Sequence, residues 1–559
     1  MTPEEMKQVQ ADIDRLVGTP PKDMAMGGAY EGASQFDNQI ALWQPTLMSA
    51  DADMLPDKEL LDARARDMDR NDAFVHWGGQ QHRDSIVGSF YLLNAKPQAE
   101  VLGKADGWSE DFQREVEPLF SLWAESPMNW VDMTRVNSLT EMIRLAVGVF
   151  VFSGEALAMA EWSRARGRDF RTAVQMVDTD RLRTPPQHVG NPRWRAGIRH
   201  NRAGAPIAAA VQVEHPHEYG MFLPQTGEFF REVPFRKPWG RQMVLHLKEQ
   251  QRVDQTRAVS DLTAGLREIA ITRKFRDITL QNAVLNASYA ASIESEMPHE
   301  VVSAQLGAGQ NMSAAISGYA NAYMGQIAAW SKASRHLTMD GIKIPHLYPG
   351  TRLQLRPAGS PGGVGQQFET SLLRYLAAAL GITYEEMSRD YSKTNYSSMK
   401  AAMLSTWRFM QARKRIVADR LANFVYRLWL EEAIWANKLT TFPASEAGRL
   451  YTDGHLNVMF DALSSAEWIG AARGQVDELK ETQAAVLRLK YGLSTREYEL
   501  ARLGKDWREV FRQQERENAE AEARGLVFSD DPNMMNAVGG DPREDRQGGE
   551  AGDEERDAD

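Results

Sequence analysis

Residues 381–402 read GITYEEMSRDYSKTNYSSMKAA, so a glycine able to end a helix precedes a polar stretch and the start of a long amphipathic pattern. Gly381 can adopt the left-handed conformation that closes a helix, and Ser388, Asp390 and Asn395 can form turns and N-caps. The polar stretch, residues 383–397, is longer than most connections in compact domains. These residues alone are consistent with an ordinary helix-capping loop or with a functional one.

A single long helix is predicted directly after this stretch, over residues 398–440. Its apolar residues recur at three- and four-residue spacing without proline: Met403, Leu404, Trp407, Met410, Val417, Leu421, Phe424, Val425 and Leu428. Asn437 is suited to end it. A helix of this length must lie across several other elements.

Length and composition bound the possibilities. The 559 residues exceed the size of a single core, so several folding units are expected. The absence of cysteine removes disulfides and thiol chemistry and suits a reducing cytoplasm. The net charge is -11, and residues 530–559 contribute -8 of it through eleven acidic residues and three arginines. Neither a signal peptide nor an apolar run long enough for a membrane span is present.

The N-terminal half changes character twice. Residues 1–56 are expected to form an arm, and residues 57–252 to begin as helices and continue as a β-rich module. In that module the apolar period becomes two, in short runs separated by Gly, Pro and Asn. The predicted strands are residues 157–164, 173–178, 208–215, 230–235 and 243–248.

The helical period then returns over residues 253–290. One stripe of this helix is apolar and cations lie beside it: Leu262, Leu266, Ile269, Arg273, Lys274 and Arg276. Residues 291–365 are rich in Gly, Ala, Ser and Met, with strands expected at 342–350 and 351–357. A second helix is expected over residues 366–382.

The C-terminal part is predicted to be helical over residues 441–527. Residues 528–559 are acidic and hold almost no large apolar side chain apart from Met534 and Met535. Such a segment cannot bury enough surface to offset its ordering entropy, so it is expected to be disordered.

Enzymatic motifs are missing from the sequence. It contains no G-x-x-x-x-G-K-[ST] loop, no G-x-S-x-G elbow and no H-E-x-x-H helix. The glycine-rich residues 359–367 lack the lysine and hydroxyl that hold a nucleotide, and read as a hinge loop. His215, His217 and Glu218 lack the further ligands of a zinc site. We therefore expect no enzyme activity, no metal and no cofactor.

Two segments carry a family resemblance. The first is AALGITYEEMSRDYSKTNYSSMK, residues 378–400, with Met387 where the family has leucine. The second, residues 468–526, contains WIGAARGQVDELKE, then GLST, and after a spacer GKDWREVFRQQ, with Ala471 and Glu478 at usual proline positions. With weaker matches from about residue 60 onward, the chain resembles the portal proteins of tailed phages of the lambda-like type.

The resemblance implies a mixed α+β, helix-dominated portal fold assembled as a cyclic ring. It makes residues 57–252 a wing, 253–290 and 366–382 stem helices, 291–365 a clip, and 441–527 further wing and crown-like helices. It makes residues 383–397 a tunnel loop facing DNA through Glu385, Glu386, Arg389, Asp390, Lys393, Asn395 and Tyr396. The stem residues are the six named above, with the apolar stripe expected to be buried between helices of the assembled ring. The clip residues expected to bind partners are Lys332, Arg335, His336 and Lys343.

The implied function is that of a channel at one capsid vertex, made of about twelve copies. Double-stranded DNA would pass through it without sequence readout during packaging and ejection. The implied partners are the terminase large subunit, a head-tail adaptor, the major capsid protein and the scaffold. The implied location is the virion, and the host bacterial cytoplasm during assembly.

The charge balance suits a channel in which DNA slides. Strong Lys/Arg contacts with phosphates would trap DNA, whereas a near-neutral wall with mixed charges would not. A helical assembly scaffold or adaptor without a channel fits the acidic, cysteine-free composition equally well. Imaging of the purified protein would separate the two, because only the channel requires a ring with a central hole.

Overall fold

The computed structural model describes residues 39–216, 229–288, 364–392, 394–474 and 478–525, with short pieces at 33, 318, 321, 324–325, 336–339 and 342–345. Most of the predicted arm, the predicted acidic tail, and Lys332, Arg335 and Lys393 lie outside these residues. The described chain is a mixed α/β, helix-rich structure.

Strand β2 (Glu155–Trp162) is buried on both faces, which places it at the centre of the body. Because successive side chains in a strand point to opposite faces, Ala156, Ala158 and Ala160 pack into the helical core, and Leu157 and Met159 pack into a second core. The small alanines allow the helices to approach closely. β2 pairs antiparallel with β3 (Thr172–Val177) and β8 (Val244–Lys248).

A second antiparallel sheet covers the outer face of β2. It consists of β4 (Trp194–Arg195), β5 (Ile198–His200), β6 (Pro206–Gln212) and β7 (Phe230–Pro234). The second core lies between the sheets and is formed by Leu157, Met159, Val177, Leu182, Ile198, Ala209, Val211, Val233 and Val244. The five predicted strands overlap β2, β3, β6, β7 and β8, so those predictions are confirmed.

Helices α6 (Leu139–Ser153) and α13 (Ala418–Trp435) cover the inner face of β2, and most of their residues are buried. α6 starts with a reciprocal cap between Ser138 and Glu141 and ends at Gly154. Gly154 has a φ of +75°, and a Cβ there would lie 2.0 Å from the carbonyl oxygen of Val259. Only glycine fits that turn.

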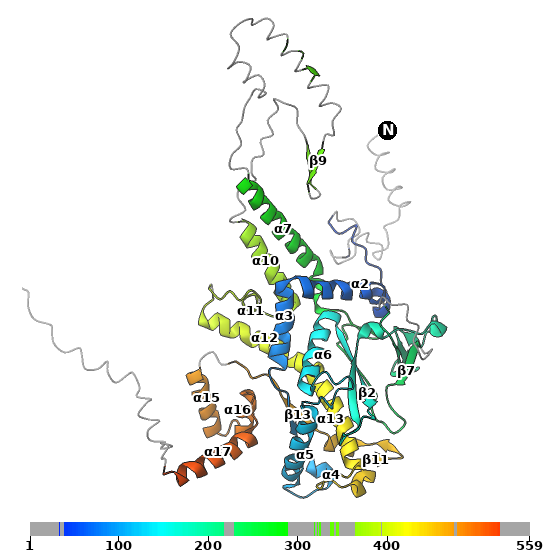
Figure 1. Cartoon of the computed structure of the whole chain (residues 1–559), viewed down its shortest axis with the longest axis vertical. Helices are drawn as coiled ribbons and strands as arrows, with labels where there is room; N and C mark the ends of the chain where they lie inside the picture. The colour runs from blue at the N-terminus through cyan, green and yellow to red at the C-terminus, as the bar shows by residue number, and fades with distance from the viewer. Residues whose placement is uncertain are drawn as a thin grey trace, which may run out of the picture.

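The remaining helices surround this core (Figure 1). They are α2 (Ala50–Asn71), α3 (Ala73–Ile86), α4 (Ala99–Leu102), α5 (Trp108–Ala124), α7 (Leu266–Ser288), α10 (Val364–Ala379), α11 (Tyr384–Ser388), α12 (Tyr396–Ile416), α14 (Val458–Leu463), α15 (Glu478–Lys490), α16 (Arg496–Arg502) and α17 (Trp507–Ala523). Three short strand pairs complete the fold: β1 (Leu92–Ala95) with β13 (Ala466–Ile469), β9 (His336–Met339) with β10 (Ile342–Pro345), and β11 (Tyr451–Thr452) with β12 (His455–Leu456).

The prediction of one helix over residues 398–440 is wrong. The segment forms two helices, α12 and α13, separated at Val417, whose φ of -107° and ψ of -65° leave the regular helical range. On either side of the break, Lys414 Nζ binds the Asp419 carboxylate at 2.7 Å and the carbonyl oxygen of Trp468 at 2.9 Å. The break could not be predicted from the sequence, because neither proline nor glycine marks it and the apolar spacing continues through it.

Two further predicted boundaries differ from the structure. α2 begins at Ala50, inside the predicted arm 1–56, because Ser49 caps it. The first stem helix begins at Leu266 and not at residue 253. Residues 261–264 before it form a 3₁₀ turn instead.

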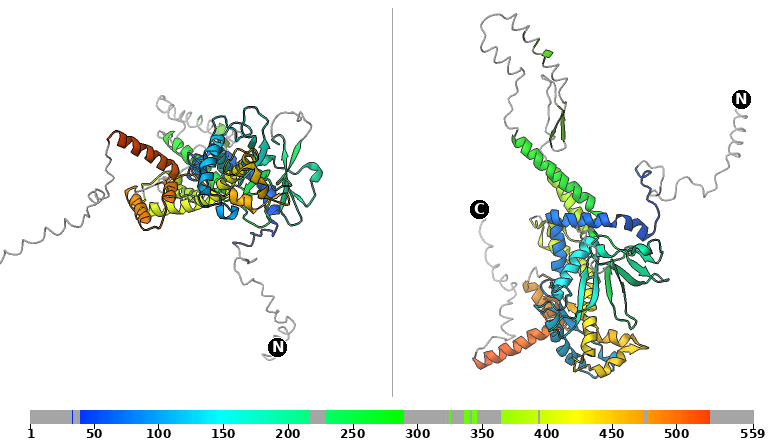
Figure 2. Two further views of the ribbon diagram at one scale, coloured as in Figure 1. Left: turned by 90° about the horizontal axis from the view of Figure 1, so that it is seen from below. Right: turned by 45° about the vertical axis from the view of Figure 1, so that its right-hand side comes forward.

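α7 and α10 lie side by side and project from the body (Figures 1 and 2). Phe275 and Phe368 stack edge to face at 5.4 Å between ring centres, and Arg276 Nε binds Glu369 at 2.7 Å. α15, α16 and α17 lie away from this pair, at the other end of the molecule (Figure 2). Among the described helices, none is both long and apolar enough to cross a bilayer.

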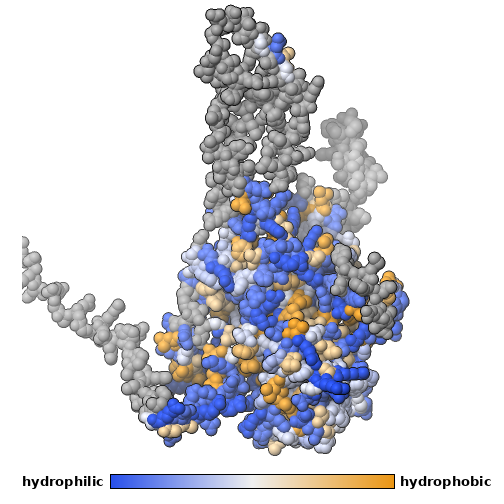
Figure 3. Space-filling model, viewed as in Figure 1, coloured by the Kyte–Doolittle hydropathy of each residue, from blue (hydrophilic) through white to orange (hydrophobic). Residues whose placement is uncertain are grey.

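The surface alternates hydrophilic and hydrophobic residues in small patches (Figure 3). α15 buries no residue, and an apolar group on it and the following turn is exposed: Leu479, Val486, Leu487, Tyr491 and Leu493. Exposed apolar residues gathered on one element are typical of a surface that contacts another protein.

Candidate functional site

The turn between α10 and α12 requires glycine at its first position. Gly381 has a φ of +66°, and a Cβ there would lie 2.5 Å from the ring of Phe409 on α12. The left-handed residue ends α10 and lets α12 pack directly against the turn. Gly381 thus acts as the sequence predicted, and the close approach of Phe409 is a second requirement that the sequence did not show.

The predicted loop 383–397 is not continuous, because α11 forms within it. Thr383 caps α11 by accepting a hydrogen bond from the backbone N–H of Glu386, and the Glu386 carboxylate accepts from the N–H of Thr383 in return. The same carboxylate accepts a hydrogen bond of 2.8 Å from the hydroxyl of Thr406 on α12. Glu386 is therefore buried in the single chain, so its predicted contact with DNA finds no exposed carboxylate here and stays untested.

α3 fixes the turn from the other side. The indole N–H of Trp77 donates to the carbonyl oxygen of Glu386 at 2.8 Å. His82 Nε2 donates to the carbonyl oxygen of Leu380 at 2.8 Å, and burial lowers the pKa of His82 to about 4, which keeps its ring neutral. These two bonds hold the end of α10 and the whole of α11 against the body.

The exposed part of the segment is residues 389–395, of which Lys393 lies outside the described residues. Arg389 closes α11 with a φ of +57°, and its guanidinium lies 3.5 Å from the centre of the Trp77 ring. Asp390 accepts hydrogen bonds from the N–H and hydroxyl of Ser392. Asn395 caps α12, whose first residue is Tyr396, and Glu385 is half-buried. The structure thus presents Arg389 and Asp390 to solvent on a firmly anchored turn.

The stem residues divide into buried and exposed groups. Leu262, Leu266 and Ile269 are 0%, 7% and 2% exposed, within the core of a single chain. Their burial is therefore confirmed within one chain, where α10 and the rest of the body cover them. Their surroundings in an assembled ring stay a prediction. Arg273 and Lys274 are exposed.

Arg276 joins the two stem helices to the body. Besides binding Glu369 on α10, its guanidinium lies 4.9 Å from the ring centre of Phe74 on α3 and 4.0 Å from the Asp72 carboxylate. The clip residues His336 and Lys343 lie on the hairpin β9–β10, in which His336 pairs with Pro345 and Lys343 with Thr338.

A buried ionic cluster lies between β2 and the segment that leads into α7, and the sequence patterns did not predict it. Glu155 on β2 is fully buried and binds Arg257 at 2.5 Å, His246 at 2.8 Å and Lys58 at 3.2 Å. Burial alone would raise the pKa of Glu155, but the charges of Arg257 and Lys58 hold it well below its usual value. Burial lowers the pKa of His246, so its ring binds as a neutral donor.

Arg257 uses every guanidinium nitrogen in this cluster. Beyond Glu155, it donates to the carbonyl oxygens of Thr179, Leu182 and Ala196 at 2.9, 3.0 and 3.3 Å. It therefore connects both sheets to the segment that leads into α7. No periodic pattern marks such a residue, because its partners are backbone atoms distant in the sequence.

The structure also brings Asp178, Asp180 and His215 together, with ligand atoms within 4.8 Å. These residue types can bind a metal. However, Arg66 lies 2.5 Å from Asp180 and 3.5 Å from Asp178. The group is thus an ion-pair cluster in which the arginine supplies the positive charge.

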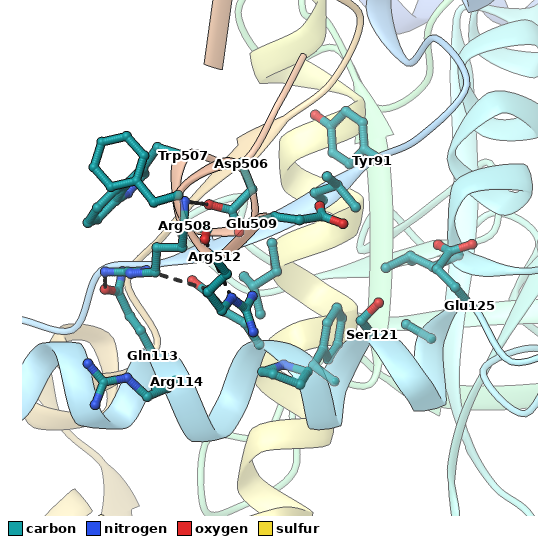
Figure 4. A pocket seen from close by; sticks show the side chains of 18 residues that line it. Tyr91, Gln113, Arg114, Ser121, Glu125, Asp506, Trp507, Arg508, Glu509 and Arg512 are labelled. Atoms are coloured by element: carbon teal, nitrogen blue, oxygen red, sulfur yellow. Dashed lines mark hydrogen bonds and ion pairs between the residues drawn. The ribbon is translucent and has the colours of Figure 1, made fainter. Parts of the chain in front are cut away.

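A cavity of about 510 Å³ separates α5 from the start of α17. In Figure 4, Arg508 extends from α17 to Gln113 on α5, to which it donates a hydrogen bond. Arg508 also lies 3.7 Å from the carboxylate of Glu117. Burial raises the pKa of Glu117 to about 7, against the opposing effects of a hydrogen bond from the N–H of Ala95 and the charge of Arg508.

Comparison with known proteins identifies the family. Residues 36–414 match the family described as phage portal protein, lambda family. The chain belongs to the lambda family of phage portal proteins. It is 34% identical to portal protein B of Escherichia phage lambda over 501 residues, which cover 89% of this chain and 91% of that protein. It is also 34% identical to the portal protein of Escherichia phage N15 over 519 residues, 92% of this chain and 94% of that one.

Solved structures give weaker likenesses. The neck of the native gene transfer agent particle, computed with C12 symmetry, aligns with a TM-score of 0.34 and 12% identity over 79% of this portal-family chain and 95% of that chain. The virion of the native particle aligns with a TM-score of 0.35 and 10% identity over 80% and 93% of the two chains.

Proposed function

We propose that this portal-family chain forms a closed ring of twelve copies at one capsid vertex. Double-stranded DNA passes through this ring during packaging and ejection, without sequence readout. The observation that carries the proposal is the match to two phage portal proteins over about nine-tenths of the chain.

The parts of the subunit take distinct roles in this proposal. The body around β2 is the wing, and the pair α7–α10 is the stem. Residues 291–365 are the clip, where Lys332, Arg335, His336 and Lys343 meet the terminase large subunit and later the head-tail adaptor. The major capsid protein and the scaffold contact the ring in the host bacterial cytoplasm during assembly.

Ring closure needs two different contact faces on each subunit. α7 supplies apolar residues for one of them, since Ile271, Ile278 and Leu280 are 44%, 43% and 67% exposed. The exposed apolar residues of α15 supply another. Because an uncovered apolar surface of this kind is unfavourable in water, its burial against a neighbouring copy would stabilise the ring.

The turn over residues 389–395 faces the channel in this proposal. With Glu386 buried, the exposed charges described on the turn are one arginine and one aspartate, Arg389 and Asp390. Lys393, which lies outside the described residues, adds a second cation to this turn. A wall of mixed charge holds phosphates weakly, so DNA can slide in both directions. The stacking of Arg389 on Trp77 restrains the cation.

Imaging of the purified protein by negative stain tests the ring. We expect a closed ring with a central hole. An elongated monomer or dimer would contradict the channel and would favour a scaffold or adaptor role.

A deletion tests the role of the turn. Removal of residues 389–393 should leave ring assembly intact and reduce the DNA packaged per head, because the channel loses its contact with the moving duplex. A second variant with five Gly and Ser residues at the same positions separates loop length from side-chain chemistry. Full-length packaging by both variants would contradict the assignment.

A further inference from the structure

A second and larger cavity, of about 1080 Å³, lies between the body and the C-terminal helices. Its walls come from α12, α13, β13, α15 and α16. These elements lie below the pair α7–α10 in Figure 1. We call this cavity the basic groove, after the cations that line it: Lys96, Lys414, Arg415, Arg420, Arg473, Arg488 and Arg502.

Four of these cations have carboxylate partners. Lys96 binds Glu467 at 2.6 Å and Glu497 at 3.3 Å, and Lys414 binds Asp419 at 2.7 Å. Arg488 and Arg502 share one acid, Glu499, at 2.8 and 3.2 Å. These ion pairs are local, and they leave the charge of the other three arginines uncompensated.

Arg415, Arg420 and Arg473 come from three elements, the end of α12, the start of α13 and the segment after β13. Within the described part of the chain, none of the three has a carboxylate within 4.0 Å. Burial lowers the pKa of Arg420 without any opposing acid. Three guanidinium groups that line one open cavity without partners favour an anionic occupant, since arginine binds carboxylates and phosphates through paired hydrogen bonds.

The chain itself contains an anionic segment, which follows α17 in the sequence. The described residues end at Gly525, two positions after α17, and residues 526–559 follow. Their acidic part, residues 530–559, holds eleven Asp or Glu residues and three Arg. The remainder of the chain is close to neutral, at -3, so this segment contains most of the net negative charge.

The segment is long enough to reach the groove. α17 has 17 residues, which at about 1.5 Å each span about 25 Å. For any chain of 34 residues, the length of residues 526–559, random-coil statistics give a root-mean-square end-to-end distance of about 30 to 35 Å. The two lengths are comparable, so the acidic residues can return along α17 to the groove beside α16.

We propose that the acidic C-terminal segment, residues 526–559, docks in the basic groove of its own chain. Its carboxylates bind Arg415, Arg420 and Arg473. The docked segment covers the groove and keeps nucleic acid away from it.

The acidic segment has an advantage over a free anionic ligand, because its attachment to the same chain gives it a high local concentration at the groove. A segment joined by a short flexible linker is present at roughly millimolar effective concentration. Double-stranded DNA can bind the same guanidinium groups, but it must compete with the effective concentration of the tethered segment. This inference goes beyond the channel function and does not depend on it, because it concerns a single chain.

Spin labels can measure the docking directly, because the chain has no cysteine of its own. One label is placed at the edge of the groove with Leu493→Cys, whose side chain is 77% exposed, and one in the segment with Gly548→Cys. In the full chain we expect a short inter-label distance at low salt. Ionic strength near about 1 M should abolish it, because the Debye length there is about 3 Å.

The groove variant is Arg415→Gln, Arg420→Gln and Arg473→Gln together. It should lose the short distance at low salt. The matched control, Arg164→Gln, Arg166→Gln and Arg193→Gln, removes the same charge from exposed positions outside the groove and should keep it. One broad distribution in all three proteins would overturn the proposal. A short distance that vanishes on dilution with unlabelled chain would overturn it in favour of a segment from another copy.

Binding of a DNA duplex gives a second, independent readout. At about 50 mM salt, a chain truncated after Gly525 should bind the duplex at least about tenfold more tightly than the full chain. The same truncation in the groove variant should change binding much less. Equal affinities for the full and truncated chains, together with weaker binding by the groove variant, would assign the groove to DNA and overturn docking of the segment.

Discussion

At the scale of single residues, charged side chains that are neighbours in the sequence differ in burial in the structure. Glu385, Glu386, Arg389 and Asp390 follow one another in a polar stretch, and each was predicted to face DNA. The structure turns Glu386 inward because Thr383 and Thr406 bind its carboxylate. The sequence could not show this, since Thr406 belongs to another helix and comes into contact only after folding.

Substitution of Gly381 tests the first residue of the turn. Gly381→Ala should lower the free energy of unfolding by roughly 2 to 4 kcal/mol, because it adds a strained backbone and a clash with Phe409. Gly492→Ala is the matched control, since its φ is also positive, at +69°, and no atom lies within 4 Å of the new Cβ. That variant should lose only about 1 to 2 kcal/mol. Chemical denaturation measures both, and equal losses would show that the contact with Phe409 has no cost.

Replacement of Arg257 tests the buried ionic cluster. Arg257→Lys should cost about 3 to 5 kcal/mol, because a lysine cannot bind Glu155 and three backbone carbonyls together and leaves buried groups unpaired. Arg252→Lys changes an exposed arginine paired with Asp53 and should stay within about 0.5 kcal/mol. Thermal unfolding compares them, and a similar midpoint for both variants would contradict the role of the cluster.

At the scale of elements, the regular spacing of apolar residues predicted the strands and helices, but it did not predict where a helix is interrupted. The strands of the β-rich module were predicted because their apolar residues alternate between two buried faces. The break at Val417 was missed because the apolar spacing on α12 continues into α13. The location of Leu262 in a 3₁₀ turn was missed for the same reason.

A pair of substitutions distinguishes the buried and exposed faces of α7. Leu266→Asp places a carboxylate in the core and should lower the free energy of unfolding by several kcal/mol, about 3 or more. Leu280→Asp lies on the same helix at 67% exposure and should leave the fold intact, with a change of about 0.5 kcal/mol or less.

Under the proposed ring, Leu280→Asp should nevertheless weaken assembly, because its side chain would face a neighbouring copy. Unfolding of the subunit and the fraction of rings in electron micrographs are measured separately. If Leu280→Asp assembled as well as the unchanged protein, this face of α7 would not be a ring contact.

At the scale of the whole molecule, the family and the general architecture could be predicted from the sequence, because two segments in the C-terminal half carry recognisable motifs. The groove and the ionic cluster were not, since each is formed by residues from elements that are distant in the chain. Arg415 and Arg473, for example, have no pattern in common and meet only when β13 packs beside α12.

The burial of Glu117 should make the free energy of unfolding depend on pH. Because its pKa in the folded chain is raised to about 7 from 4.5, its ionisation opposes folding. Its contribution is most favourable below pH 4.5 and is lost as the pH rises to about 7, by at most about 3 kcal/mol. Glu117→Gln should therefore flatten the fall in stability between these pH values.

Glu110→Gln, on the exposed face of the same helix, serves as the control and should leave the slope unchanged. Denaturation midpoints at several pH values give the slopes. If Glu117→Gln and the unchanged protein lost stability equally over this range, the burial of Glu117 would not govern the titration.

The pairing of α7 with α10 has a consequence for how such a protein can diversify. The chain leaves the body along α7 and returns along α10, which lies beside it. Two contacts join these helices directly. Phe275 on α7 packs against Phe368 on α10, and Arg276 on α7 binds Glu369 on α10. Under the proposed role of residues 291–365 as the clip, a chimera that carries the corresponding segment of a relative should keep the fold of the body and change only the partners that it binds.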